Sequence, residues 1–349
     1  NLQTKLMRKI NILFFILFAG YFCGYSAGRE NYIRCYNIID SMLDGTKDTS
    51  FKKAVYEVEN AWYDGKLDET EFYSVIRNYA LLCTEKGKMM DIRYDFDDIR
   101  SFRNHASLFS FMTDTTLIYI DDTTFVNHPP FIYGEENIME NKDWGRTSVT
   151  SLLVTHRGNC RSLPILYKLI AGEMGEKAWL ALAPNHLYIK LHNKTNGWYN
   201  TELTSGVFPT DAWLMASGYI HTDAVKNEMY LDTLSLQESI ALCLTDLADS
   251  YLHKFPETGY DDFVLWCCDK ALEYFPHYIN ALLIKAEELR FRYEHNAEKP
   301  ESLRKEIDKL YTHIHKLGYR KMPEKMYREW LLSLKTKNKP ENEDEHLPH

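Results

Sequence analysis

The chain lacks the residue patterns of several common functional sites. It has seven cysteines among 349 residues, but no Cys-x-x-Cys pair and no Cys/His cluster with zinc spacing. The acidic run Tyr94–Asp98 lacks the regular Asp, Gly and Glu positions of a calcium-binding loop. The sequence therefore predicts no metal site and no cofactor.

Positive charge is scarce as well. The chain has 41 lysines and arginines against 50 aspartates and glutamates, a formal net charge of -9. A nucleic-acid partner needs a basic face, so we expect none. With 45% hydrophobic and 26% charged residues, the composition is that of a globular protein, and the length allows two or three domains.

One strongly apolar run lies near the start of the sequence. Ile10–Phe22 follows Arg8 and Lys9 and precedes the small residues Ser26–Gly28, which is the pattern of an export signal. The run is too short for a comfortable membrane span, and its alternatives are a buried core helix or an uncleaved anchor. We predict a signal peptide over residues 1–28, a periplasmic or extracellular location, and no stable membrane insertion after its removal.

The segment 29–140 is predicted to be mostly helical. Apolar residues from Phe72 to Cys83 recur at the spacing of one buried helix face, with Asp68 as the expected N-cap and Gly87 as the expected C-cap. By contrast, the β-branched residues and the proline pair of Thr113–Pro130 favour a strand or an extended loop.

Residues 141–209 form a separate predicted core in which helices precede strands. A short helix is expected over Ser148–Thr155. The next helix should begin between Asn159 and Leu163, because Pro164 is tolerated only in a first turn. Gly175 ends that helix, and a buried strand follows it.

Two further strands flank the turn-forming residues 192–197 and predict a β-hairpin. Placing Leu191 opposite Gly197 sets His186 opposite Glu202, with Cβ atoms roughly 5 Å apart on one face of the sheet. A shift of one residue would move the two side chains to opposite faces. The hairpin therefore predicts a His–Glu pair, provided that the turn has the length assumed here.

The segment 210–334 is predicted to be all helical. Ser235 begins a capping box, and an apolar helix face follows it. The polar stretch 335–349 should be disordered. Small residues and a proline also stand at the spacings of a tetratricopeptide helix pair: Ala271, Pro276 and Ala286.

The predicted elements bring one chemical constellation together. Cys160 lies at a helix start, where free amides and the helix dipole favour a thiolate. His186 begins a strand, and Glu202 or Asn200 lies on the neighbouring strand. A thiolate, an imidazole that stabilises it, and a carboxylate or amide that orients the imidazole are the groups of nucleophilic thiol catalysis. Glu202 is favoured over Asn200 because it lies directly opposite His186 and carries a charge.

Simpler structural roles are open for each of these residues. Cys160 can be a plain packed cysteine, and His186 alone would be read as a core or turn histidine. The six cysteines that follow the predicted signal are too few for a disulfide-dense scaffold. Three side chains are candidate oxyanion donors: Trp144, Asn159 and Asn185.

Other residues near the predicted site receive structural interpretations. Trp144 and Trp198 are expected to be core aromatics. His156 and Arg157 are expected to be solvated loop residues or substrate contacts rather than catalysts.

The runs "RGNCRSLPILYKLIAGEMG", "APNHLYIKL" and "GWYNTEL" resemble the bacterial transglutaminase-like core, in particular the subgroup with tetratricopeptide repeats after the core. The resemblance implies an α+β fold with a helix packed on a small antiparallel sheet. It also implies that Cys160 is the nucleophile and His186 the base. Glu202 stands where that family usually has Asp, which leaves Asn200 as the alternative orienting residue.

Two classes of function follow. The first is a cysteine enzyme that hydrolyses or transamidates a peptide, a protein or a cell-wall peptide through a thioester. The second is a non-catalytic protein that keeps the fold and binds a peptide in a helical-repeat groove. The presence of both Cys160 and His186 favours the enzyme.

Overall fold

The computed structural model describes residues 25–119, 121, 123–134, 143–256, 259, 261–323, 325–326 and 329. Most of the predicted signal peptide and the whole predicted disordered tail lie outside these residues. Helix α2, Tyr25–Leu43, includes the small residues Ser26–Gly28 in its first turn. Within the described chain, no helix has the length and apolar character needed to cross a membrane.

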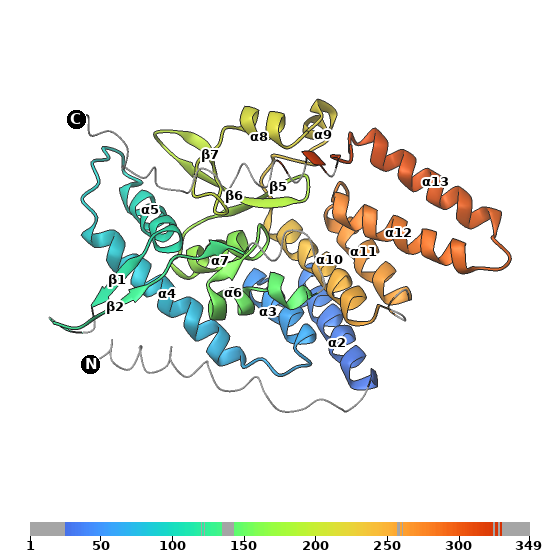
Figure 1. The fold of residues 1–349 in the computed structure, drawn as a ribbon, viewed down its shortest axis with the longest axis horizontal. Coiled ribbons are helices and arrows are strands. Elements are labelled where there is room, and N and C mark those ends of the chain that lie inside the picture. Colours follow the sequence, from blue (N-terminus) through green and yellow to red (C-terminus); the bar gives the residue numbers. More distant parts are fainter. Residues whose placement is uncertain are drawn as a thin grey trace, which may run out of the picture.

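The first part of the chain is helical, as predicted. Its helices are α2, α3 (Phe51–Trp62), α4 (Glu69–Met89) and α5 (Ile99–Thr113). α2 packs on α3, and α4 packs on α5 (Figure 1). The predicted apolar face of α4 is buried throughout.

The ends of α4 confirm one predicted cap and correct the other. Asp68 accepts a hydrogen bond from the backbone N–H of Glu71 at 3.0 Å, as an N-cap does. The prediction that Gly87 is the C-cap is wrong, because the helix continues to Met89. A Cβ atom at Gly87 would lie 3.3 Å from the Arg103 carbonyl oxygen of α5. This glycine therefore permits two helices to approach closely.

Two short pairs of strands follow α5. β1 (Thr116–Tyr119) and β2 (Phe125–His128) form an antiparallel hairpin, which confirms the extended structure predicted there. β3 (Ile132–Tyr133) pairs in parallel with β4 (Arg157–Gly158). This parallel pairing, which the sequence did not predict, ties the N-terminal half to the residues just before Cys160.

The central part contains the predicted helices. A 3-10 turn, η3 (Trp144–Thr147), leads into α6 (Val149–Thr155), and α7 (Ser162–Glu173) begins inside the predicted window. Gly175 follows α7 with φ +75°, which confirms it as the stop.

A three-stranded antiparallel sheet packs on α7. Its strands are β5 (Trp179–Ala183), β6 (His186–Asn193) and β7 (Gly197–Thr201), with β6 in the middle. α7 contacts β5 and β6. The described chain is thus a mixed fold of many helices and small sheets, compatible with the α+β class.

The predicted register of the β6–β7 hairpin is wrong by two residues. Asn193, not Leu191, lies opposite Gly197, so the turn has three residues and Gly197 adopts φ +65°. Asn193 stabilises this tighter turn by accepting a hydrogen bond from the Asn196 N–H at 2.7 Å. A shift of two residues keeps every side chain on its predicted face of the sheet. His186 and Glu202 therefore stay on one face.

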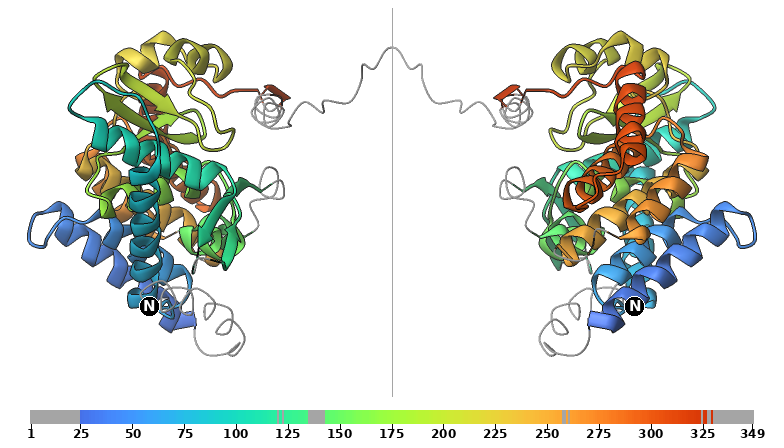
Figure 2. Two further views of the ribbon diagram at one scale, coloured as in Figure 1. Left: turned by 90° about the vertical axis from the view of Figure 1, so that its left-hand side faces the viewer. Right: turned by 90° about the vertical axis from the view of Figure 1, so that its right-hand side faces the viewer.

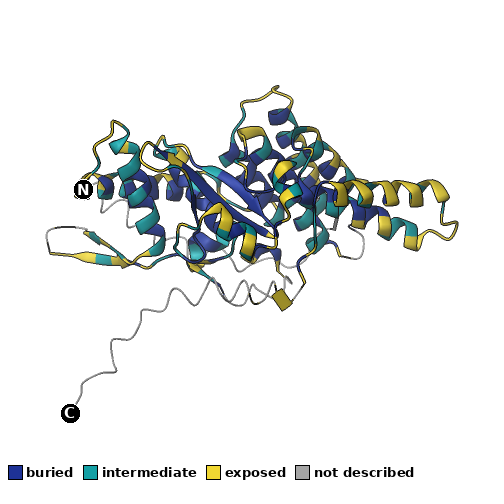
Figure 3. Ribbon diagram, turned by 90° about the horizontal axis from the view of Figure 1, so that it is seen from above, coloured by how far each residue is buried: buried dark blue, intermediate teal, exposed yellow. Residues whose placement is uncertain are grey.

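The last part of the described chain is helical, as predicted. The helices are α8 (Asp211–Ser217), α9 (Thr222–Lys226), α10 (Leu236–Lys254), α11 (Asp262–Tyr274), α12 (Ile279–His295) and α13 (Glu301–Lys316). The Ser235–Glu238 capping box is present. From α10 to α13 each helix packs on the next, and α13 exposes most of its residues (Figure 3).

Helix α10 is central to the molecule. It packs on α2, α3 and α11. The sheet with α8 and α9 lies at one end of the molecule and α2 lies at the other (Figure 2). Ala271 and Ala286, on α11 and α12, are fully buried, and Pro276 lies in the turn that joins these helices.

Candidate active site

Cys160 lies in the turn between β4 and α7, two residues before the helix begins. Its Sγ atom is 3.6 Å from the carbonyl oxygen of Asn185. The Asn159 side-chain oxygen accepts hydrogen bonds from the N–H groups of Arg161 and Ser162, both at 3.0 Å, and so caps the turn that carries the thiol. The six described cysteines are free thiols, and the other five are buried while Cys160 is half-buried.

His186 and Glu202 form a buried pair beside this turn. The Nε2 atom of His186, the first residue of β6, bonds to Oε2 of Glu202 just beyond the end of β7. The other carboxylate oxygen accepts bonds from the N–H and the hydroxyl of Thr204, at 2.8 and 2.6 Å. Both paired side chains are almost wholly buried. The carboxylate is therefore held from two sides.

Three residues of the sequence constellation come together in this structure. The Nε2 atom of His186 bonds to Glu202, and the Cys160 thiol is near enough to the same imidazole to raise its pKa. Since Nε2 faces Glu202, Nδ1 is the ring nitrogen left for the thiol. An imidazole between a thiol and a carboxylate is the geometry that thiol catalysis requires.

Both members of the His186–Glu202 pair favour their charged forms despite burial. Burial by itself lowers the pKa of His186, but the Glu202 carboxylate and the hydrogen bond to Cys160 outweigh it and raise that pKa to about 10. Burial opposes ionisation of Glu202, yet the His186 charge and the Thr204 hydrogen bonds leave its pKa lowered. At neutral pH the pair is therefore an imidazolium and a carboxylate.

These opposite shifts predict how stability depends on pH. The raised pKa of His186 gives stability that is fully present below its ordinary value of 6.5 and is lost as the pH rises toward about 10. The lowered pKa of Glu202 gives stability that is present above its ordinary value of 4.5 and is lost in acid. Urea unfolding at pH 6, 8 and 10 should show the advantage of the native chain over a His186→Gln, Glu202→Gln double variant shrinking with pH. An advantage that is constant over this range would contradict the ion pair.

Asn200, the alternative orienting residue, lies on the expected face but serves another cluster. Its amide donates to the Pro209 carbonyl oxygen at 2.9 Å and to the Asp211 carboxylate at 2.7 Å. Lys190 reaches the same carboxylate at 3.3 Å. These contacts join Asn200 to the start of α8, and its amide donor group does not point to His186.

The three candidate oxyanion donors have different positions. Trp144 is buried, and its ring centroid lies 4.9 Å from the guanidinium carbon of Arg161. Asn159 uses its amide oxygen for the cap described above. Asn185 is exposed, has φ +52°, and meets the thiol through its backbone carbonyl. Of these three residues, Asn185 is therefore the one that contacts the Cys160 Sγ atom.

The neighbouring residues partly correct the sequence predictions. His156 stacks on Phe131, with ring centroids 4.7 Å apart, and is not a freely solvated loop residue. Arg157 is exposed, as predicted. Trp144 is a core aromatic, as predicted, but Trp198 is 51% exposed and lies next to the hairpin turn on the edge strand β7.

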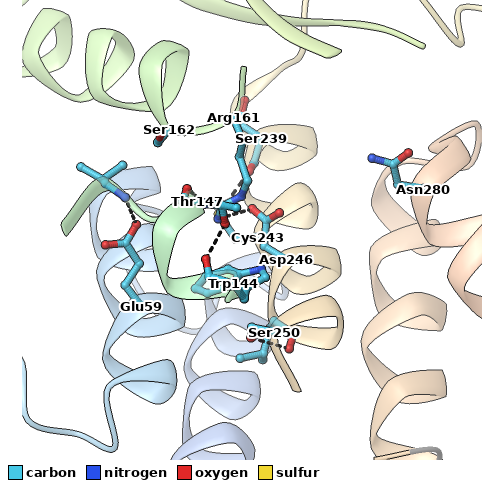
Figure 4. Close-up of polar contacts among 12 residues, drawn as sticks. Glu59, Trp144, Thr147, Arg161, Ser162, Ser239, Cys243, Asp246, Ser250 and Asn280 are labelled. Atoms are coloured by element: carbon cyan, nitrogen blue, oxygen red, sulfur yellow. Dashed lines mark hydrogen bonds and ion pairs between the residues drawn. The ribbon is translucent and has the colours of Figure 1, made fainter. Parts of the chain in front are cut away.

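Sequence reasoning missed Arg161 and Asp246. Arg161 follows Cys160 directly, and its guanidinium contacts Asp246 on α10 at 2.7 Å (Figure 4). No periodic pattern marks either residue as part of a site. The single signal in the sequence was a charged residue beside the cysteine at the start of an otherwise apolar helix.

Within the described residues, no group of three or more His, Cys, Asp or Glu side chains is arranged to hold a metal ion. No protein-family model, curated protein or solved structure matches this chain. The functional assignment therefore depends on the geometry of the site.

Proposed function

We propose that the protein is a transglutaminase-like cysteine enzyme that transfers acyl groups from amides or esters. The observation that carries the proposal is the position of His186, which bonds to the Glu202 carboxylate and directly follows Asn185, whose carbonyl oxygen lies 3.6 Å from the Cys160 Sγ atom. The start of α7 next to Cys160 adds backbone donors for negative charge. Together these features support a nucleophile, a proton carrier and an orienting residue.

In the first half of the reaction, the Cys160 thiolate attacks the substrate carbonyl carbon and a C–S bond forms. The His186 imidazolium gives its proton to the departing amine or alkoxide as the bond from the carbonyl carbon to that group breaks. The product is a thioester on Cys160. Glu202 keeps the imidazole in one orientation and stabilises its charged form throughout.

In the second half, water or an amine attacks the thioester. Neutral His186 takes a proton from that nucleophile, the C–S bond breaks, and the Cys160 thiolate and the His186 imidazolium are restored. Water gives hydrolysis, whereas an amine gives transamidation.

The same proposal assigns roles to the larger parts of the chain. α7 and the sheet β5–β7 are the transglutaminase-like core, and α10–α13 are the tetratricopeptide-like region. With the predicted signal peptide, the substrates are peptides, proteins or cell-wall peptides outside the cytoplasm. The helix-on-sheet packing and the succession of packed helices support these assignments.

Selective alkylation tests the proposal without a known substrate. We expect iodoacetamide at pH 7 to modify Cys160 at least about 100-fold faster than any buried cysteine, because it is half-buried and lies beside the His186 imidazole, whose pKa it helps to raise. Site-resolved mass spectrometry measures the rates. A Cys160→Ser chain is the control for labelling at other positions.

Exposure alone would also make Cys160 the fastest thiol, so a second comparison is needed. His186→Gln should slow alkylation of Cys160 about 10-fold or more while the chain stays folded. If Cys160 reacts equally fast with and without the imidazole, the thiol is not activated and the proposal is wrong.

A further inference from the structure

The side chain of Arg161 turns away from the candidate active site and enters the protein. Its Nη1 atom donates to the Thr147 carbonyl oxygen at 2.9 Å, and its Nη2 atom donates to the Asp246 carboxylate at 2.7 Å. The guanidinium carbon lies 4.9 Å from the ring centroid of Trp144. Figure 4 shows these groups converging between η3 and α10.

This ion pair is much less exposed than an ordinary surface pair. The side chains of Arg161 and Asp246 are 16% and 13% exposed. Burial opposes the charge on Arg161, but the Asp246 carboxylate outweighs it and the pKa of the guanidinium is raised. Other acidic groups also interact with this guanidinium: Cys243, Asp249 and Glu59, the last of which is itself engaged with the start of α6. Removing either partner would leave a charge with little solvent around it.

The buried Arg161–Asp246 pair constrains the backbone at Cys160, because Cys160 and Arg161 share a peptide bond. On one side of that bond, Asn159 caps the turn. On the other side, the two guanidinium hydrogen bonds of Arg161 hold the backbone against η3 and α10.

We propose that Arg161 is a positioning residue, held by Asp246 of α10, that keeps the Cys160 thiol against His186. This inference rests on the proposed function and deepens it. It gives the C-terminal helical region a part in the site, because α10 supplies the carboxylate. A planar guanidinium is needed, since one group must satisfy a carboxylate and a carbonyl oxygen in fixed directions.

The test compares Cys160 alkylation rates in Asp246→Asn, Arg161→Lys and native protein from pH 5 to 9. We expect Asp246→Asn to lower the rate roughly 10-fold or more, since a displacement of about 1 Å is sufficient for such losses. Arg161→Lys keeps the charge but loses the paired guanidinium donors, so its Cys160 alkylation rate should lie between those of Asp246→Asn and the native chain. The pH dependence of the alkylation rate in Asp246→Asn should also approach that of His186→Gln. Loss of a purely structural contact would not change this pH dependence.

The control is Asp40→Asn, far from the site, which removes one of the three acidic partners of the half-buried Lys270: Asp40, Asp44 and Glu273. Lys270 contacts Asp40 at 2.9 Å, is 15% exposed, and joins α11 to α2. We expect this variant to lower the urea midpoint but to leave the Cys160 rate within about twofold of native.

Each result has a definite meaning. If native Cys160 is activated but folded Asp246→Asn reacts at the native rate with the native pH profile, the positioning role is wrong and the proposed function stands. If native Cys160 shows no activation by His186, the proposed function fails and the positioning role fails with it. If Asp40→Asn slows Cys160 as much as Asp246→Asn does, the effect is general loosening and the inference is overturned.

Discussion

Replacement of Glu202 by glutamine should lower acyl transfer by roughly 10²- to 10⁴-fold. The amide has nearly the same shape but cannot stabilise an imidazolium as a carboxylate does. It also presents an NH₂ group that can face His186 and favour the wrong ring tautomer. Because Thr204 holds the other oxygen, the new side chain should stay in place and the chain should stay folded.

The matched control for this prediction is Asn200→Ala, on the same strand face. Its amide donates to Pro209 and Asp211, so we expect acyl transfer within a few-fold of native. The chromogenic ester p-nitrophenyl acetate provides the measurement, because attack by Cys160 releases nitrophenolate and a stable thioester would give a burst. A larger loss in Asn200→Ala than in Glu202→Gln would transfer the orienting role to Asn200.

The largest loss of stability is expected at Glu59. This wholly buried carboxylate accepts hydrogen bonds from the N–H groups of Val149 and Thr150, at 2.6 and 2.8 Å, and from the Thr150 hydroxyl. Glu59→Ala would leave those donors unsatisfied at the buried start of α6. We expect the free energy of unfolding to fall by about 3 kcal/mol.

Urea unfolding at pH 7 measures this loss, with Glu59→Gln as the control. Glutamine keeps one acceptor and the side-chain volume, so its loss should be smaller than that of alanine. A change below about 0.5 kcal/mol in Glu59→Ala would mean that water or Ser148, the N-cap of α6, satisfies the donors instead.

The local elements could be predicted because their causes lie within a few residues. Asp68 and Ser235 cap their own helices, and Pro164 fixes the start of α7 to within a turn. The hairpin was predictable, but its register was not, since the choice between a turn of five and one of three residues depends on how Asn193 and Gly197 close it.

The shared sheet face of His186 and Glu202, two residues of the candidate site, was predictable from strand alternation. Side chains alternate between the two faces of a strand, so a register error of two residues leaves His186 and Glu202 on the same face. The position of Cys160 followed from the start of α7. In the observed register, Glu202 lies diagonally across from His186 rather than directly opposite it. That the two side chains nevertheless touch follows only from the tertiary position of the chain at the end of β7.

Other features were decided by the tertiary structure alone. Arg161 meets Asp246 across 85 residues of sequence, and Glu59 meets Val149 across 90. The parallel pairing of β3 with β4 is equally non-local. Periodicity and capping report interactions within one or two helical turns, whereas these contacts depend on which helix faces are packed together. The sequence by itself determined most elements and the candidate site residues, whereas the packing of α10 against the Cys160 turn and of α3 against the start of α6 decided how these segments are held.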